Sequence, residues 1–275
     1  MVLINKKEPY MNKFARMKKT RNLSLLLIIS LLFSFFVCLA CGKEKNIIKP
    51  AENVMPPKDT MMNQPAADTL RTSDSTGAKF LALGDSYTIG QSVGENERFP
   101  AQTVRLLQSQ NINAQYPEYI ATTGWTTTNL LSAINSQNPS KDFDIVTLLI
   151  GVNDQYQTED TTGYRERFSE LLNKAVEFAG GRKTHVFVLS IPDYGATPFV
   201  QQSNKAAVSM QIDQFNAINK EITLQNGITY IDITPSTRQA ANDASLIAND
   251  GLHPSGKEYA VWAGMLAPLI KKVLQ

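Results

Sequence analysis

Residues 81–88 read Leu-Ala-Leu-Gly-Asp-Ser-Tyr-Thr. The apolar run from Phe80 to Leu83 predicts a buried β-strand, which stops at a glycine followed at once by an acid and a hydroxyl. In an open α/β sheet, ligands and reactive groups lie just beyond the carboxyl ends of the strands. Ser86 is therefore a candidate for a reactive hydroxyl. Many strands end in a turn of this composition, so the candidate depends on what the rest of the chain supplies.

Strand and helix patterns alternate through the rest of the chain. The predicted strands are Phe80–Leu83, Gln115–Ala121, Asp144–Ile150, His185–Ile191 and Ile228–Ile233. The first predicted helix begins at Phe99, and the next three cover Thr128–Ile134, Tyr164–Ala179 and Lys205–Leu224. The last predicted helix begins after Ser255, where Ser255 and Glu258 have the spacing of a capping box. This alternation predicts an α/β fold with a mostly parallel five-stranded sheet covered by helices on both faces, a three-layer α/β/α sandwich.

The first 41 residues have the composition of a signal segment. Residues 1–40 hold seven Lys and Arg against Glu8 alone, a charge of +6 that leaves −4 for the rest of a chain whose total is +2. A basic start followed by an apolar run from Leu23 to Ala40 is typical of a secretory signal. The sequence Leu-Ala-Cys-Gly at 39–42 resembles a bacterial lipoprotein signal, in which Cys41 would be lipidated. The alternative is a single N-terminal transmembrane anchor, since the run is nearly long enough to span a bilayer.

Both alternatives hold the folded part at a membrane surface outside the cytoplasm, periplasmic or on the cell surface. Residues 42–77, rich in proline and polar side chains, are predicted to be a flexible linker, and residues 78–275 the folded domain. A mildly acidic domain without a basic block does not suit a nucleic-acid partner. Cys38 and Cys41 are the only cysteines, so the domain has no thiol for a nucleophile, a disulfide or a metal site.

A serine nucleophile needs a base, and the chain holds only two histidines. His185 follows Arg-Lys-Thr at the start of a predicted strand, where a structural role is expected. His253 lies in Asn-Asp-Gly-Leu-His-Pro at 249–254, just before the last helix. A turn at this spacing can bring the Asp250 carboxylate to Nδ1 of His253 and leave Nε2 to face a serine. The alternative is an Asp-Gly turn that only leads into the helix.

Donors for an oxyanion are offered at two other strand ends. Gly151-Val152-Asn153-Asp154 follows the strongest strand pattern, and Asn153 carries an uncharged amide donor. Gly124 follows the second strand and can present its backbone N–H without a side chain in the way. Each of these residues could equally serve only to form a turn.

Four sequence blocks together resemble the SGNH hydrolase family, the GDSL-type esterases, over residues 78–275. The blocks are Gly84-Asp85-Ser86, Gly124, Gly151-Val152-Asn153-Asp154 and Asp250-Gly251-Leu252-His253. The first block reads Gly-Asp-Ser-Tyr where the family has Gly-Asp-Ser-Leu, and the chain has no Gly-x-Ser-x-Gly elbow of the ordinary α/β-hydrolases. The resemblance implies a flavodoxin-like fold with Ser86 as nucleophile, His253 as base and Asp250 as its orienter. It also implies an oxyanion hole made by the N–H groups of Ser86 and Gly124 and the side chain of Asn153. This chemistry requires no metal or organic cofactor.

We therefore predict a membrane-anchored serine ester hydrolase acting on a small-molecule, lipid or glycan ester. The alternatives are a lysophospholipase or thioesterase for long acyl chains, a carbohydrate acetyl esterase, or a non-catalytic lipoprotein that binds a ligand in the same crevice. Four aromatic residues near strand ends could stack on sugar rings or could equally serve as packing: Tyr87, Trp125, Tyr156 and Tyr194. Of these, Tyr87, Trp125 and Tyr194 are the candidates for the substrate side.

Overall fold

The computed structural model describes residues 76–158 and 161–275. The predicted signal segment, with its lipidation site at Cys41, lies outside the described residues. The linker predicted over 42–77 is described only at its last two positions. The domain boundaries therefore stay predictions. In the described part of the chain, no helix has the length and apolar character needed to cross a membrane.

Five parallel strands form one sheet in the order β2-β1-β3-β4-β5. The strands are β1 (Phe80–Gly84), β2 (Glu118–Ala121), β3 (Ile145–Leu149), β4 (Val186–Leu189) and β5 (Thr229–Ile231). Every residue of β1, β3 and β4 is buried. Strands buried on both faces are predominantly apolar, which is why the sequence shows nearly continuous apolar runs here rather than alternation.

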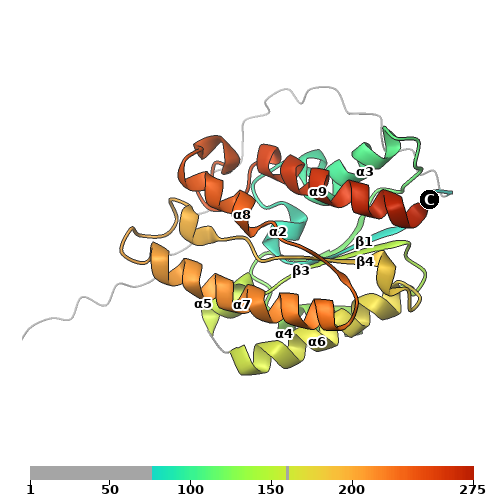
Figure 1. Cartoon of the computed structure of the whole chain (residues 1–275), viewed down its shortest axis with the longest axis horizontal. Coiled ribbons are helices and arrows are strands. Elements are labelled where there is room, and N and C mark those ends of the chain that lie inside the picture. The colour runs from blue at the N-terminus through green and yellow to red at the C-terminus, as the bar shows by residue number, and fades with distance from the viewer. Residues whose placement is uncertain (1–75, 159–160) are drawn as a thin grey trace, which may run out of the picture. The chain divides into compact units, whose positions relative to one another are not determined.

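Helices cover both faces of this sheet (Figure 1). On one face α3 (Phe99–Gln108) packs against α9 (Gly256–Leu274), and α4 (Thr127–Gln137), α6 (Thr161–Phe178) and α7 (Lys205–Gln225) lie on the other. Trp262 of α9 is fully buried, with ring centroids 5.9 Å from Phe99 and 4.9 Å from Tyr259. The three-layer α/β/α sandwich predicted from the sequence is confirmed.

Several element boundaries differ from the predictions. Strand β2 begins at Glu118 instead of Gln115, and Pro117, just before it, has no N–H to give to a ladder. Strand β4 begins after His185, because residues 183–185 form a 3₁₀ turn. Strand β5 is limited to Thr229–Ile231, and Ile233 already leads into the short helix α8 (Thr234–Thr237).

The capping box predicted at the start of α9 is only half formed. The Ser255 hydroxyl accepts a hydrogen bond from the Glu258 N–H at 3.4 Å. The Glu258 carboxylate, which should reach back to Ser255, instead accepts hydrogen bonds from Ser236 Oγ (2.6 Å) and Trp262 Nε1 (2.7 Å). Glu258 is 2% exposed, and a buried carboxylate is better satisfied by these two donors than by a backbone N–H at the helix start.

The strand order creates a crevice where it reverses direction. The chain passes from β1 outward to β2 and then returns to β3 on the other side of β1. The loops after β1 and β3 therefore diverge, and the space between them is where ligands bind in sheets of this order. Ser86 follows β1 and Asn153 follows β3, so both lie at this crevice.

Candidate active site

Ser86 is the first residue of α2 (Ser86–Ile89), a single helical turn that follows β1 directly. The backbone at the strand end allows no side chain: a Cβ on Gly84 would lie 2.3 Å from the carbonyl oxygen of Leu149 and 2.1 Å from Thr88 Oγ1. Glycine there lets β1 and β3 end in close contact. As the first helical residue, Ser86 also has a backbone N–H with no partner within the helix.

Asp85 caps this helix and is completely buried. Its Oδ1 accepts a hydrogen bond from the Tyr87 N–H at 3.0 Å. Its Oδ2 has no hydrogen-bond partner among the described residues. Burial raises the pKa of Asp85 to about 8, against the opposing effect of the bond from Tyr87, and nearby Asp154 raises the pKa further. Because its side chain accepts the Tyr87 N–H, Asp85 acts as the N-cap that forms this turn.

The loop before α9 places an imidazole against the serine. His253 Nε2 lies 3.0 Å from Ser86 Oγ, and His253 Nδ1 lies 2.6 Å from Asp250 Oδ2. Gly251, with φ +73°, supplies the left-handed backbone that the Asp250-to-His253 turn requires. The structure thus brings together the three side chains proposed from the sequence, in the order hydroxyl, imidazole, carboxylate.

Asp250 is surrounded by donors. Its Oδ1 accepts the backbone N–H groups of Leu252 and His253, both at 2.9 Å, and its Oδ2 also accepts the hydroxyl of Ser92 at 2.6 Å. Partial burial opposes ionisation, but the hydrogen bonds from Ser92, His253 and the two N–H groups outweigh it and lower the pKa of Asp250 below its ordinary value. The carboxylate beside the imidazole is therefore held in its charged form.

The second histidine is distant from this chemistry. His185 Nδ1 lies 2.7 Å from the carbonyl oxygen of Asp144, at the start of β3. This contact joins the ends of two neighbouring strands and agrees with the structural role expected from the sequence.

The two outer oxyanion candidates lie in loops that are hydrogen-bonded to each other. The Asn153 amide donates to the carbonyl oxygen of Trp125 at 3.0 Å, and Gln157 Nε2 donates to the carbonyl oxygen of Gly124 at 3.2 Å. Asn153 and Gln157 belong to α5 (Val152–Gln157), the short helix that follows β3. Gly124 has φ +82° with no atom within 4 Å of the position a Cβ would take, so its N–H is unobstructed from that side.

An open pocket of about 490 Å³ joins these groups. Its polar part contains Ser86, Gly124, Asn153 and His253, and its walls are largely apolar: Tyr87, Val152, Tyr156, Tyr194, Phe199 and Leu252. Of the predicted substrate-side aromatic residues, Tyr87 and Tyr194 line the pocket. Trp125 does not; it is partly buried against the core and offers its carbonyl to Asn153.

Two wall residues are exposed at the pocket mouth. Tyr156 is 61% exposed and Phe199 is 51% exposed, with their ring centroids 6.4 Å apart and Tyr194 within 6.4 Å of both. Phe199 is not predicted from the sequence as a site residue, because it lies in an irregular segment with no periodic pattern. The only available signal was its position shortly after the fourth strand.

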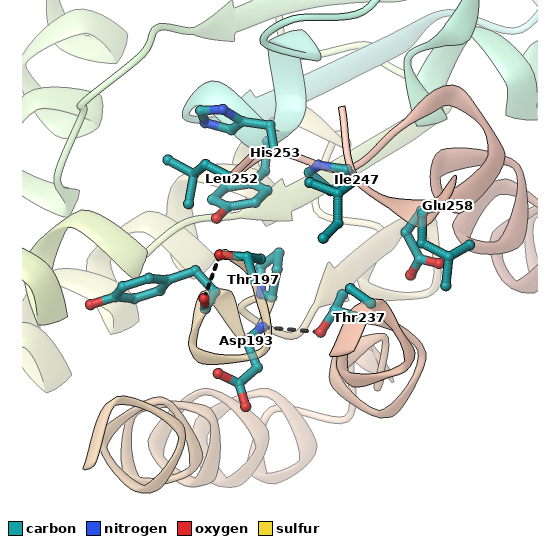
Figure 2. A pocket seen from close by; sticks show the side chains of 13 residues that line it. Asp193, Thr197, Thr237, Ile247, Leu252, His253 and Glu258 are labelled. Atoms are coloured by element: carbon teal, nitrogen blue, oxygen red, sulfur yellow. Dashed lines mark hydrogen bonds between the residues drawn. The ribbon is translucent and has the colours of Figure 1, made fainter. Parts of the chain in front are cut away.

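A second pocket adjoins the first. The lining residues that the two pockets share are Tyr87, Tyr194, Leu252 and His253. Figure 2 shows His253 and Ile247 on one side of it and Thr237 and Asp193 on the other, with the Asp193 carboxylate pointing away from the cavity. The Asp193 N–H donates to Thr237 Oγ1 at 3.0 Å, and the carboxylate accepts from Arg238 Nε at 2.8 Å. These bonds fix the segment opposite the imidazole.

Comparison with known proteins places this arrangement in context. The model of the GDSL-like lipase/acylhydrolase family matches residues 82–261. No curated protein sequence matches the chain. In the described residues, no group of three or more His, Cys, Asp or Glu side chains could hold a metal ion.

Solved structures with the same fold include two esterases and one lipase. The psychrotrophic esterase EstA from Pseudoalteromonas sp. is 15% identical with a TM-score of 0.55, and the match covers 71% of this chain and 98% of that one. The lipase Lip_vut3 from a goat rumen metagenome is 21% identical with a TM-score of 0.56, covering 70% and 97%. The acetylxylan esterase Axe2 from Geobacillus stearothermophilus is 20% identical with a TM-score of 0.52, covering 70% and 95%.

Proposed function

Given that the chain belongs to the GDSL-like lipase/acylhydrolase family and is a carboxylic ester hydrolase, we propose that Ser86, His253 and Asp250 form its catalytic triad. The observation that carries the assignment is the continuous chain of contacts from Ser86 Oγ to His253 Nε2 (3.0 Å) and from His253 Nδ1 to Asp250 Oδ2 (2.6 Å). These are the distances that proton transfer and orientation of the base require.

The reaction then proceeds in two halves. His253 removes the proton as Ser86 Oγ attacks the ester carbonyl, and it returns that proton to the leaving alcohol, which gives an acyl-enzyme. Water, activated by the same imidazole, releases the acid. The charged Asp250 stabilises the imidazolium that forms in each half.

The developing oxyanion is stabilised by three uncharged donors in this proposal: the N–H groups of Ser86 and Gly124 and the amide of Asn153. All three residues line the same pocket. Donors held by neighbouring backbone need no reorganisation when negative charge develops, which is the main source of stabilisation in such sites. The hydrogen bond from Asn153 to the Trp125 carbonyl fixes the orientation of the amide.

The main test is hydrolysis of a short p-nitrophenyl ester by the purified protein and by Ser86→Ala and His253→Ala variants. We expect each variant to lose about 10⁴-fold or more in kcat. Circular dichroism and thermal unfolding would check that the variants remain folded. A folded wild-type protein without activity, or a Ser86→Ala variant with unchanged kcat, would refute the triad assignment.

An apolar acyl chain is the substrate part that the pocket favours. Its walls are formed mainly by apolar and aromatic side chains, and the exposed rings of Tyr156 and Phe199 extend this surface beyond the pocket mouth. Longer chains would bury more of this surface, so a lysophospholipase or thioesterase activity is the second candidate. Rates on acetyl, octanoyl and lysophospholipid substrates would decide: a preference for acetyl esters of sugars would instead favour a carbohydrate acetyl esterase.

The location of the enzyme remains a proposal from the sequence. We propose that lipidation of Cys41 holds the domain at the outer side of a bacterial membrane, beside ester substrates. The support is the basic, apolar and Leu-Ala-Cys-Gly succession within residues 1–42. Metabolic labelling with a fatty acid would test it. A Cys41→Ser protein that stays unprocessed and still partitions into the membrane would favour the transmembrane alternative.

A further inference from the structure

The loop that leaves α2 reaches across to the loop that carries the base. Gly90 ends α2 in the left-handed conformation, and its N–H and that of Gln91 both donate to the carbonyl oxygen of Ser86, the latter at 3.0 Å. Ser92 comes next and donates its hydroxyl to Asp250 Oδ2 at 2.6 Å, across 158 residues of sequence. In the described residues, this is the only hydrogen bond to the Asp250 carboxylate from outside residues 250–253.

Ser92 adopts a backbone conformation that serine rarely takes. Its φ is +68°, and the other two non-glycine residues with positive φ in the described chain are Asn111 and Asn138. Asparagine tolerates this region because its side chain bonds locally, whereas serine gains little there. Strained residues persist where surrounding contacts hold them, and for Ser92 the structure gives one such side-chain contact, the bond to Asp250.

Among the described residues, two hydrogen bonds join the segment that carries Ser86 to the loop that carries His253, and they behave differently in the reaction. The contact between Ser86 Oγ and His253 Nε2 must break when the serine becomes acylated. The contact between Ser92 and Asp250 involves no reacting atom and can persist through the whole cycle. The same loop also approaches the oxyanion side, because Gln91 Oε1 accepts from Thr123 Oγ1, next to Gly124, at 2.6 Å.

We propose that Ser92 is a positioning residue of the esterase, whose hydroxyl keeps Asp250, and through it His253, in register with Ser86 during turnover. The inference rests on the proposed triad and goes beyond it, since Ser92 lies outside all four sequence blocks. The hydroxyl also shares Oδ2 of Asp250 with the imidazole. Without it, the carboxylate becomes a stronger acceptor for the imidazolium, and the Asp250–His253 pair holds its proton to higher pH.

The test compares Ser92→Ala and Ser92→Gly in the full-length protein. Alanine keeps the strained backbone and glycine relieves it, but both remove the hydroxyl, so a change common to both belongs to the hydroxyl. We expect kcat on a short p-nitrophenyl ester to fall about tenfold in both variants, with KM within about twofold of the wild type. We also expect the acidic limb of the kcat/KM profile to move to higher pH by about half a unit.

Matched controls separate this from a merely structural effect. Ser169→Ala removes another serine hydroxyl, one that donates to the Arg165 carbonyl, and Asn138→Gly relieves a positive φ elsewhere. Both should leave kcat and the pH profile unchanged. The ring of Tyr87 lies beside the imidazole, with its centroid 5.1 Å from that of His253. Because Tyr87 is the same in every variant, this contact does not account for a difference between them. Loss of activity without movement of the acidic limb, or no loss at all, would overturn the proposal.

An NMR titration gives a readout that does not depend on activity. The chain has two histidines, so a His185→Gln background leaves the His253 signals alone. The midpoint of this titration should move to higher pH in Ser92→Ala and Ser92→Gly even if the protein hydrolyses none of the esters tried. An unmoved midpoint refutes the role of Ser92, whereas an inactive wild-type protein with a moved midpoint refutes only the proposed function.

Discussion

Two aspartates lie beside the Ser86–His253 contact, one in the turn after β1 and one in the loop before α9, and their surroundings are opposite. Asp85 is fully buried and accepts one backbone N–H, while its second carboxylate oxygen has no partner among the described residues. Asp250 is partly exposed and accepts four hydrogen bonds. The pKa of Asp85 is raised to about 8 by its burial, whereas that of Asp250 is lowered.

This difference shows why nearness to the nucleophile does not make a catalytic acid. Asp85 precedes Ser86 directly, yet a carboxyl with one donor in an apolar interior is most stable when protonated. A neutral carboxyl cannot stabilise an imidazolium. Asp250 comes from the far end of the chain, and its four donors keep the negative charge that this role requires.

Of the two aspartates, Asp250 is expected to give the larger effect on turnover when it loses its charge. In Asp250→Asn, the amide has nearly the shape of the carboxylate, but it cannot stabilise a positive imidazolium and it favours the wrong tautomer of His253. We expect kcat to fall by about 10³- to 10⁴-fold with KM little changed. Steady-state kinetics on a p-nitrophenyl ester would measure this.

Asp85→Asn is the matched control for that experiment. If the two aspartates have the different roles inferred from their donors, this variant retains kcat within about threefold of the wild type. Equal losses of kcat in Asp250→Asn and Asp85→Asn would mean that the two aspartates do not have different roles. Asp85 would then also serve the reaction through its charge.

The glycines beside these aspartates provide the next largest effect. A Cβ on Gly84 would meet the Leu149 carbonyl at 2.3 Å, so Gly84→Ala forces β1 and β3 apart at their carboxyl ends. We expect a loss of about 3 kcal/mol in the free energy of unfolding, at the upper end for an overpacked site. Urea unfolding followed by circular dichroism would measure this loss.

Gly251 offers the contrast. Its φ is +73°, but the nearest atom to an added Cβ is Pro198 Cβ at 4.0 Å, so Gly251→Ala meets backbone strain without a clash. A loss of about 1 kcal/mol is expected there. Losses of similar size at both positions would contradict the distinction between a glycine required by space and one required by its backbone angle.

The strands and the turn around the site can be predicted from the sequence, because the signals for them are local. Apolar runs locate β1 and β3, and the short spacing from Asp250 to His253 predicts that one turn joins the two side chains. Ser92 carries no such signal, since it is an exposed loop serine whose partner lies 158 residues away. The same holds for Phe199 at the pocket mouth and for Glu258, whose carboxylate turns from the expected cap to Trp262.

The burial of Asp85 could not be predicted from the sequence either. Aspartate side chains are mostly exposed in folded proteins. Only the packing of α2 against β1 and β2 shows that Asp85 is completely buried. The sequence therefore supported its function as a turn residue but gave no indication of its proton. The raised pKa depends on the three-dimensional packing around the turn.

The Asp85→Asn substitution is expected to have the smallest effect on turnover. Its main effect is on the pH dependence of the free energy of unfolding. An unfolded aspartate releases its proton near pH 4, whereas folded Asp85 holds it up to about pH 8. Between these values unfolding releases a proton, so the free energy of unfolding falls as pH rises through this window. Asparagine keeps the cap to the Tyr87 N–H and removes the titration. Urea unfolding at pH 5, 6, 7 and 8 should therefore show the wild type losing stability relative to Asp85→Asn, and parallel curves would mean that Asp85 is ionised in the folded protein.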